Sequence, residues 1–163
     1  MKIFARGSWL AAGVILGIAA TSAVQRDLFG QALPSRIPRR IIRPEKAPNT
    51  GLPFSPGVLA GSTLYISGHL GRSPATNALV AGGVEAETRQ SLANIREVLR
   101  AAGMDFKDVT YVTAYITSFQ DFEKFNAVYR EVFPTDQPAH ATVQVSALNA
   151  GAHVELQMIA VRQ

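Results

Sequence analysis

Cysteine is absent from the 163-residue sequence. Its absence excludes disulfides, thiol nucleophiles and attachment of a lipid through a cysteine. Aromatic residues are few, at 8%, whereas hydrophobic residues make up 47% of the chain. A chain of this length and composition is expected to form one domain around a single hydrophobic core.

Acidic residues are scarce in the first part of the chain. Residues 1–46 hold eight lysines and arginines and two acidic residues, a net charge of +6, whereas residues 47–163 hold eight against ten, a net charge of −2. The overall charge of +4 therefore comes from the N-terminal segment. The acidic body lacks the basic face that nucleic acids bind, so we expect no nucleic-acid partner.

Residues 1–32 have the pattern of an export signal. Lys2 and Arg6 precede an uncharged run over 9–20, small residues follow this run at 21–23, and the whole stretch over 7–25 is uncharged. The pattern predicts a signal peptide that is cleaved after Ala23 or after Ala32, with the domain exported to the periplasm. The uncharged stretch also fits an uncleaved inner-membrane anchor that leaves the domain outside the cytoplasm.

Residues 33–52 are rich in proline and positive charge. They contain four prolines and five lysines or arginines. This composition predicts an extended linker, either a solvated spacer or a positive tether beside an anionic membrane surface. The folded domain is then expected over 53–163.

Strand and helix patterns alternate along 53–163. The expected elements are strands over 57–60 and 63–67, a helix over 83–102, a strand over 109–117, a second helix capped by Ser118, and strands over 140–146 and 153–161. The order β-β-α-β-α-β-β predicts an α+β fold with two helices on one face of a mixed sheet.

Alternation along the strands divides the predicted sheet into two faces. The apolar face, which the helices cover, is predicted to include Val143 and Val145. The second face, rich in tyrosine, threonine and amide side chains, is predicted to include His140, Thr142 and Glu155. Such a face favours a symmetric homo-oligomer, and the alternative is a half-exposed sheet that faces water.

Residues 53–162 resemble the Rid (YjgF) family of reactive intermediate deaminases. The resemblance rests on PFSPGVLAGSTLYISGHLG (53–71), ETRQSLANIREVLRAAGMDFKDV (87–109), FEKFNAVYREVF (122–133), PAHATVQVSAL (138–148) and VELQMIAV (154–161). It implies a chorismate-mutase-like subunit and a homotrimer with three pockets at subunit interfaces. It also implies hydrolysis of 2-imino or enamine acids to 2-keto acids and ammonia, without metal or cofactor.

The resemblance implies particular site residues. Ser67 and Gly68 match the Ser-Gly pair of the family, and Glu155 matches its acidic residue in the last strand. His140 stands where the family has an arginine that grips the substrate carboxylate, and an imidazole cannot reproduce that bidentate contact. Phe54 stands where the family has a tyrosine, so one hydroxyl donor is missing.

Three further residues complete the candidate ligand site. They are His69, at a position where the family often has glutamine, together with Asn126 and Thr142. Ser67 is expected to form a hydrogen bond rather than to act as a nucleophile, because no base with an orienting group adjoins it.

Plainer roles remain open for the charged candidates. The alternative for His140 and Glu155 is that they are polar residues of a subunit interface that take no part in a reaction. A metal site that combines His69, His140, His153 and Glu155 is a weak alternative, because these residues show no metal-binding motif.

The predicted function is that of a Rid-like hydrolase. It deaminates a small imine or enamine to a carbonyl compound and ammonia, and the acid group of its substrate is absent or held differently. The alternative is a non-catalytic trimer that binds a small molecule on the same scaffold. RNA cleavage has no support, because the body of the chain is acidic and lacks a stripe of basic and aromatic residues.

Overall fold

The computed structural model describes residues 37–45, 51 and 53–162. One sheet runs through this part of the chain in the order β1-β2-β3-β6-β4-β5. β5 is parallel to β4, and the other neighbouring strands are antiparallel. The strands are β1 (Arg39–Ile42), β2 (Gly57–Ala60), β3 (Thr63–Leu70), β4 (Val109–Ile116), β5 (Ala139–Gln144) and β6 (Val154–Val161).

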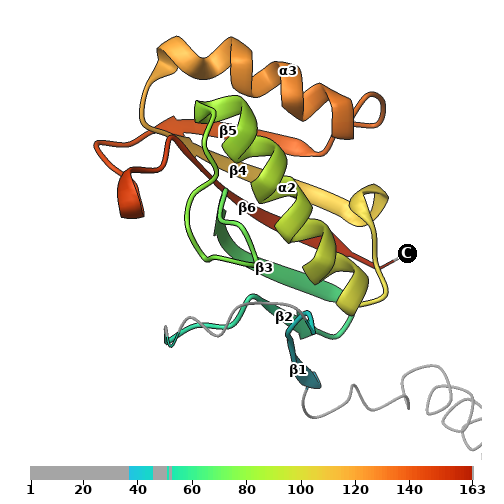
Figure 1. Cartoon of the computed structure of the whole chain (residues 1–163). Coiled ribbons are helices and arrows are strands. Elements are labelled where there is room, and N and C mark those ends of the chain that lie inside the picture. The colour runs from blue at the N-terminus through green and yellow to red at the C-terminus, as the bar shows by residue number, and fades with distance from the viewer. Residues whose placement is uncertain (1–36, 46–50, 52, 163) are drawn as a thin grey trace, which may run out of the picture. The chain divides into compact units, whose positions relative to one another are not determined.

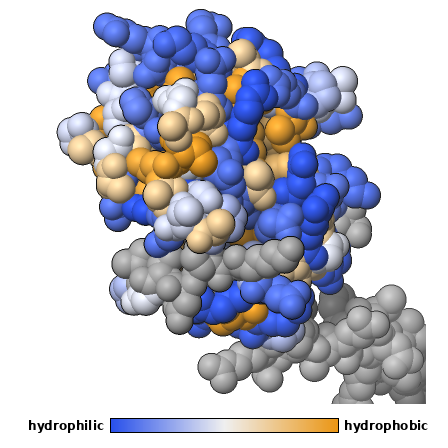
Figure 2. All heavy atoms as spheres, in the orientation of Figure 1, coloured by the Kyte–Doolittle hydropathy of each residue, from blue (hydrophilic) through white to orange (hydrophobic). Residues whose placement is uncertain are grey.

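Two helices lie on the same face of this sheet (Figure 1). They are α2 (Gly83–Ala101) and α3 (Phe122–Val132), and three short 3-10 turns accompany them: η1 (Phe106–Asp108), η2 (Phe119–Asp121) and η3 (Asn149–Gly151). The predicted α+β class and the two helices on a mixed sheet are confirmed, with β1 as an additional strand. The outward side of the helices is mostly hydrophilic, with apolar residues interspersed (Figure 2).

The core forms between the helices and the apolar face of the sheet. α2 contributes residues spaced three and four apart, so that they share one side of the helix, and α3 does the same with Phe125 and Tyr129. Burial of each such side chain contributes roughly 1.5–3 kcal/mol to folding. The fully buried residues of the sheet and α2 include Leu64, Ile66, Ile95, Leu99, Val112, Ala114, Ile116, Val154, Leu156 and Met158.

The alternation predicted for β5 is wrong. Within the sheet His140 pairs with Val112, and Thr142 pairs with Ala114. Val112 and Ala114 are buried and point to the helices. Paired residues of neighbouring strands share a face, so His140 and Thr142 lie on the helix side. Val143 lies on the opposite side and is 43% exposed. The prediction failed because the apolar side of this edge strand, formed by Ala139, Ala141 and Val143, lies away from the helices, whereas the His140 ring packs on aromatic residues of α3.

The linker predicted over 33–52 is wrong for Arg39–Ile42, which form β1. This strand pairs antiparallel with β2, where Ile42 is opposite Gly57 and Ile41 is opposite Val58. The Ile42 side chain is 2% exposed and belongs to the core, whereas Ile41 is 42% exposed. Only one residue of the strand is buried in the core, so its sequence has no apolar period that a pattern search detects.

The predicted signal or anchor over 1–32 lies outside the described residues. Among the helices that the structure does describe, none is both long and apolar enough to cross a membrane. The choice between a cleaved signal and an anchor therefore stays a prediction.

Replacement of Ile42 by alanine is expected to destabilise the domain by about 2–5 kcal/mol, because it leaves a cavity where β1 meets the core. Ile41→Ala on the same strand is the matched control, and its cost is expected to stay below about 1 kcal/mol because the side chain is largely exposed. Urea unfolding of both variants measures the difference. Equal costs would show that β1 does not contribute to the core.

Candidate functional site

Glu155 and Gly68 form the tightest contact among the predicted site residues. β3 pairs irregularly with β6 between Ile66 and His69, and Gly68 lies in this irregular stretch. The Glu155 carboxyl group lies directly over it, and a Cβ atom at position 68 would be 2.8 Å from Glu155 Cδ. A side chain at position 68 would push the Glu155 carboxyl group aside, so glycine is what allows the carboxyl group to lie over this backbone.

The chemistry of the Glu155 carboxyl group follows from its environment. Burial raises its pKa above the usual value, because water is partly removed from the charged form. No hydrogen bond to this carboxyl group is found within residues 37–45, 51 and 53–162. A carboxyl group that is half-buried, unpaired and easier to protonate is suited to accept and return a proton.

Ser67 ties the segment before β2 to β3. Its hydroxyl donates a hydrogen bond to the carbonyl oxygen of Ser55 at 2.6 Å, and its backbone N–H donates to the carbonyl oxygen of Pro56 at 3.0 Å. The hydroxyl therefore donates its hydrogen bond to the backbone, and the predicted role of Ser67 in ligand binding stays a prediction. Phe54, which precedes the tied segment, is 49% exposed. We call Phe54, Ser67, Gly68 and Glu155 the Glu155 half-site.

His140 packs against aromatic residues of α3. Its ring stacks on Tyr129 with the centroids 4.7 Å apart and 24° between the planes, and it meets Phe125 edge to face at 5.9 Å. Its Nε2 atom lies 3.2 Å from Thr142 Oγ1. Burial lowers the pKa of His140, so the imidazole is neutral at pH 7.

Asn126 lies beside Phe125 in α3 and is partly buried. We call Asn126, His140 and Thr142 the His140 half-site. Its neutral imidazole offers a single donor, whereas a guanidinium would offer two parallel donors to one carboxylate and a fixed charge.

One subunit does not bring the two half-sites together. Glu155 pairs with Tyr115, which lies on the face opposite the helices, whereas His140 lies on the helix side. β4 also separates the strands that carry them, since the sheet order places it between β6 and β5. The predicted pocket around both residues is therefore not formed within one subunit.

The side chain of His69 does not join the Glu155 half-site, in contrast to its predicted role in ligand binding. It pairs with Leu156 on the core side of the sheet, away from the face that carries Glu155. Burial lowers its pKa to about 4. Its Nε2 atom is buried and has no hydrogen-bond partner in the part of the chain that the structure describes.

The sequence did not predict a functional pair between His153 and Glu87. The Glu87 carboxylate accepts hydrogen bonds from the backbone N–H and from Nδ1 of His153, both at 2.7 Å, and Glu87 is 3% exposed. The sequence does contain a signal for this pair, because Glu87 is a charged residue on the side of α2 that faces the core. No three histidine, aspartate or glutamate side chains gather as a metal site within the described residues.

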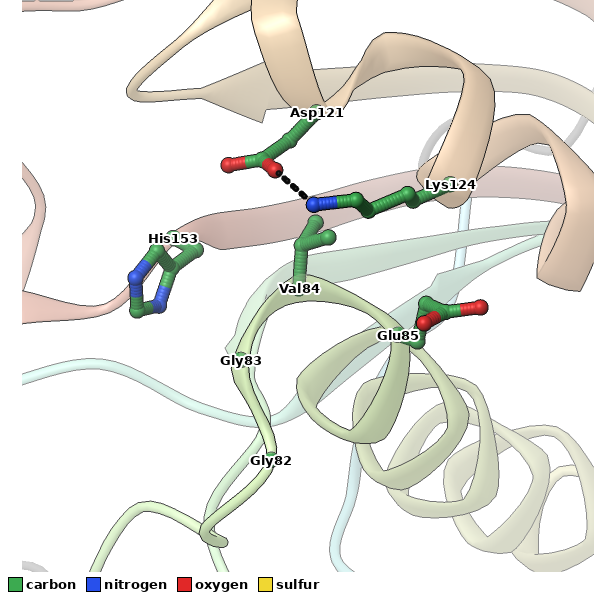
Figure 3. A pocket seen from close by; sticks show the side chains of 7 residues that line it. All are labelled: Gly82, Gly83, Val84, Glu85, Asp121, Lys124 and His153. Carbon is green, nitrogen blue, oxygen red and sulfur yellow. Dashed lines mark hydrogen bonds and ion pairs between the residues drawn. The ribbon is translucent and has the colours of Figure 1, made fainter.

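A hollow of about 220 Å³ lies beside His153 at the start of α2 (Figure 3). Asp121 and Lys124 from the α3 region line its other side and form an ion pair at 3.2 Å. None of the eight predicted ligand-site residues lines it. Its lining consists of Gly82, Gly83, Val84, Glu85, Asp121, Lys124 and His153.

Comparison with known proteins assigns the chain to one family. A family model described as endoribonuclease L-PSP matches residues 44–162. A curated relative named 2-iminobutanoate/2-iminopropanoate deaminase, from Capra hircus, is 46% identical over 128 residues, which cover 78% of this chain and 93% of the relative.

Solved structures give the same assignment. YyfA from Yersinia pestis, described as a conserved Rid family protein, has a TM-score of 0.73 and 36% identity, covering 77% of this chain and all of that one. Escherichia coli TdcF with bound serine has a TM-score of 0.72 and 33% identity, covering 76% of this chain and 99% of that one.

The buried His69 makes stability depend on pH in a defined direction. Its pKa is lowered in the folded state, so the unfolded chain binds the proton more readily as the pH falls. The stability that His69 contributes is complete above about pH 6.5 and is lost as the pH falls to about 4, by up to about 3 kcal/mol. Urea unfolding across this range is expected to give a shallower pH dependence for His69→Leu than for the unaltered chain. The same dependence in both would contradict the burial of His69.

Proposed function

The chain belongs to the Rid (YjgF) family, whose model is described as endoribonuclease L-PSP, and on this basis we propose that it hydrolyses small imines or enamines. The observation that carries the proposal is the Glu155 carboxyl group, half-buried and with a raised pKa, over the backbone of Gly68. The names of the curated relatives support the same reaction class. The products are a carbonyl compound and ammonia.

In the proposed reaction, water adds to the carbon of the C=N bond, and Glu155 accepts a proton from that water. The same carboxyl group returns the proton to the nitrogen. The resulting carbinolamine then loses its hydroxyl proton, which the carboxylate carries to the same nitrogen, as the C–N bond breaks; ammonia leaves, and the oxygen of water becomes the carbonyl oxygen. The balance needs neither an oxidant nor a reductant, because water supplies every atom that is transferred.

His140 supports an altered substrate range. The family arginine that the resemblance implies would hold a carboxylate by two charge-assisted bonds, worth about 1.5–3 kcal/mol each. The neutral His140, stacked on Tyr129 and close to Thr142 Oγ1, offers less to an anion. The proposed substrates are therefore imines whose acid group is absent or is bound elsewhere.

Replacement of His140 by arginine is expected to raise kcat/KM about 10- to 100-fold for imines and enamines that carry a carboxylate, such as the enamine 2-aminoacrylate. The reason is that a guanidinium can stack on Tyr129 and still bind the anion. The measurement follows ammonia and keto-acid release while the imine is generated enzymatically. Thr135→Arg adds the same charge at an exposed position before β5 and serves as the control.

Two outcomes of this assay would each contradict one of the proposals. If the unaltered chain accelerates the hydrolysis of no imine over buffer, the deaminase proposal fails and a non-catalytic, ligand-binding trimer is favoured. If His140→Arg and Thr135→Arg change the rates equally, His140 does not set the substrate range.

We also propose a homotrimer with a small-molecule site at each subunit interface. The two half-sites lie on opposite faces of one subunit, so each needs a neighbouring chain to complete a pocket. The face away from the helices exposes large side chains suited to contact with another copy, namely Tyr65 at 51%, Tyr111 at 39% and Val143 at 43%.

Val143→Lys is expected to lower the mass of the protein in solution from that of three chains to that of one, because the lysine would place an unpaired charge in the proposed contact. Ala93→Lys, on the exposed side of α2, is the control and is expected to keep the trimer. Light scattering measures the mass of both variants. A trimer that persists with Val143→Lys would exclude this face as the interface.

Export to the periplasm is the localisation that we propose, with an inner-membrane anchor as the alternative. The support is the uncharged stretch over 7–25 after two basic residues. Cell fractionation of a bacterium that expresses the full chain distinguishes the soluble periplasmic form from the membrane-bound form, and domain found in the cytoplasm would refute both.

A further inference from the structure

The side of α2 that faces the sheet carries polar residues among its apolar ones, and three of them reach beyond the helix for their hydrogen bonds, whereas Thr88 bonds within it. Glu87, Ser91 and Asn94 follow one another at helical spacing, and Glu87 and Ser91 are 3% and 0% exposed. Polar groups in such a position cost stability unless they are hydrogen-bonded. We call these three residues the polar seam.

Two residues of the polar seam bind the end of β3. Ser91 Oγ donates a hydrogen bond to the carbonyl oxygen of His69 at 2.8 Å. The Asn94 side-chain amide donates to the carbonyl oxygen of Arg72 at 2.9 Å and to that of Leu70 at 3.3 Å. These carbonyl groups directly follow the irregular stretch that contains Gly68.

Glu87 joins the end of β3 to the start of β6. Its carboxylate accepts two hydrogen bonds from His153, the residue immediately before β6. Its backbone packs against Gly71, where a Cβ atom would be 2.6 Å from the Glu87 carbonyl oxygen and 2.8 Å from its Cβ. A single buried residue of α2 therefore contacts both strands.

The two strands meet at this place in a register that brings the Glu155 half-site together. Leu70 pairs with Glu155, and His69 pairs with Leu156. Glu155 lies two residues after His153, and Gly68 lies one residue before His69. The contacts of the polar seam thus fall on both sides of the point where the Glu155 carboxyl group lies over Gly68.

We propose that Glu87 is a positioning residue for Glu155, supported by Ser91 and Asn94. Glu87 touches no reacting atom, and it acts by holding the start of β6 against the end of β3. This inference rests on the proposed function for its effect on the reaction rate. A displacement of about 1 Å in a reacting group can reduce a rate about 100-fold, so a loose strand end has a large effect on catalysis.

The test compares variants of the full chain at two glutamates of α2. Glu87→Ala removes the acceptor from His153, Glu87→Gln keeps one acceptor oxygen at nearly the same volume, and Glu97→Ala removes an exposed carboxylate that pairs with Arg100 on the surface. Imine hydrolysis gives kcat and KM separately. Carbon-13 NMR of labelled glutamate carboxyl groups gives the pKa of Glu155 without any need for catalysis.

Glu87→Ala is expected to lower kcat about 10- to 100-fold with KM within about twofold, because Glu155 is misplaced while the rest of the site remains. The pKa of Glu155 is expected to fall toward its ordinary value, since a loosened carboxyl group gains water. Glu87→Gln is expected to change kcat and the pKa of Glu155 less than Glu87→Ala does. Glu97→Ala is expected to change neither quantity.

Every other result also bears on whether Glu87 positions Glu155. A folded Glu87→Ala variant with unchanged kcat and unchanged Glu155 pKa overturns the inference, as does an equal effect of Glu97→Ala. If Glu87→Ala does not fold, Glu87→Gln decides by the same two readouts. If the unaltered chain hydrolyses no imine, the proposed function fails, and the Glu155 pKa alone then confirms or refutes the positioning by Glu87.

Discussion

The approach of the Glu155 carboxyl group to the Gly68 backbone is the contact on which the site depends. It requires a residue without Cβ at position 68 and an irregular pairing between β3 and β6. It also takes the carboxyl group partly out of water without giving it a hydrogen-bond partner within the described residues. Folding must offset that cost elsewhere, and the buried hydrogen bonds of α2 to the same two strands lie next to it.

The sheet separates the two half-sites. Helices cover one side, where His140 rests on the aromatic residues of α3, and Glu155 lies on the other side. A subunit that folds correctly but stays alone would therefore present two incomplete surfaces. Under the proposed assembly, activity and association are linked by mass action, because whatever weakens the contact between copies also removes the site.

The sequence predicted most of the fold from position 53 onward because the strands that bind the helices are strongly apolar on one side. Leu64, Ile66 and Leu156 leave no doubt about which way β3 and β6 face. The same method failed on β5, where His140 alternates with small and β-branched residues and the aromatic rings of α3 decide the orientation. It also missed β1, in which a single residue enters the core.

The site was predictable in part. The resemblance to the Rid family identified Ser67, Gly68 and Glu155, and the structure places them together with a physical reason for the glycine. The role of Glu87 was not predictable, because its partner His153 lies 66 residues further along the chain and a helical pattern carries no information on such a contact.

The position of β1 determines where the chain enters the domain. β1 and β5 are the two opposite edges of the sheet, so the backbone arrives at Arg39 on the edge farthest from His140. Whatever precedes Arg39, be it a leader, a tether or a fusion partner, joins the domain at β1, and four strands lie between β1 and β5. The amino-terminal side is therefore where this scaffold tolerates additions without obstructing the strand that carries His140.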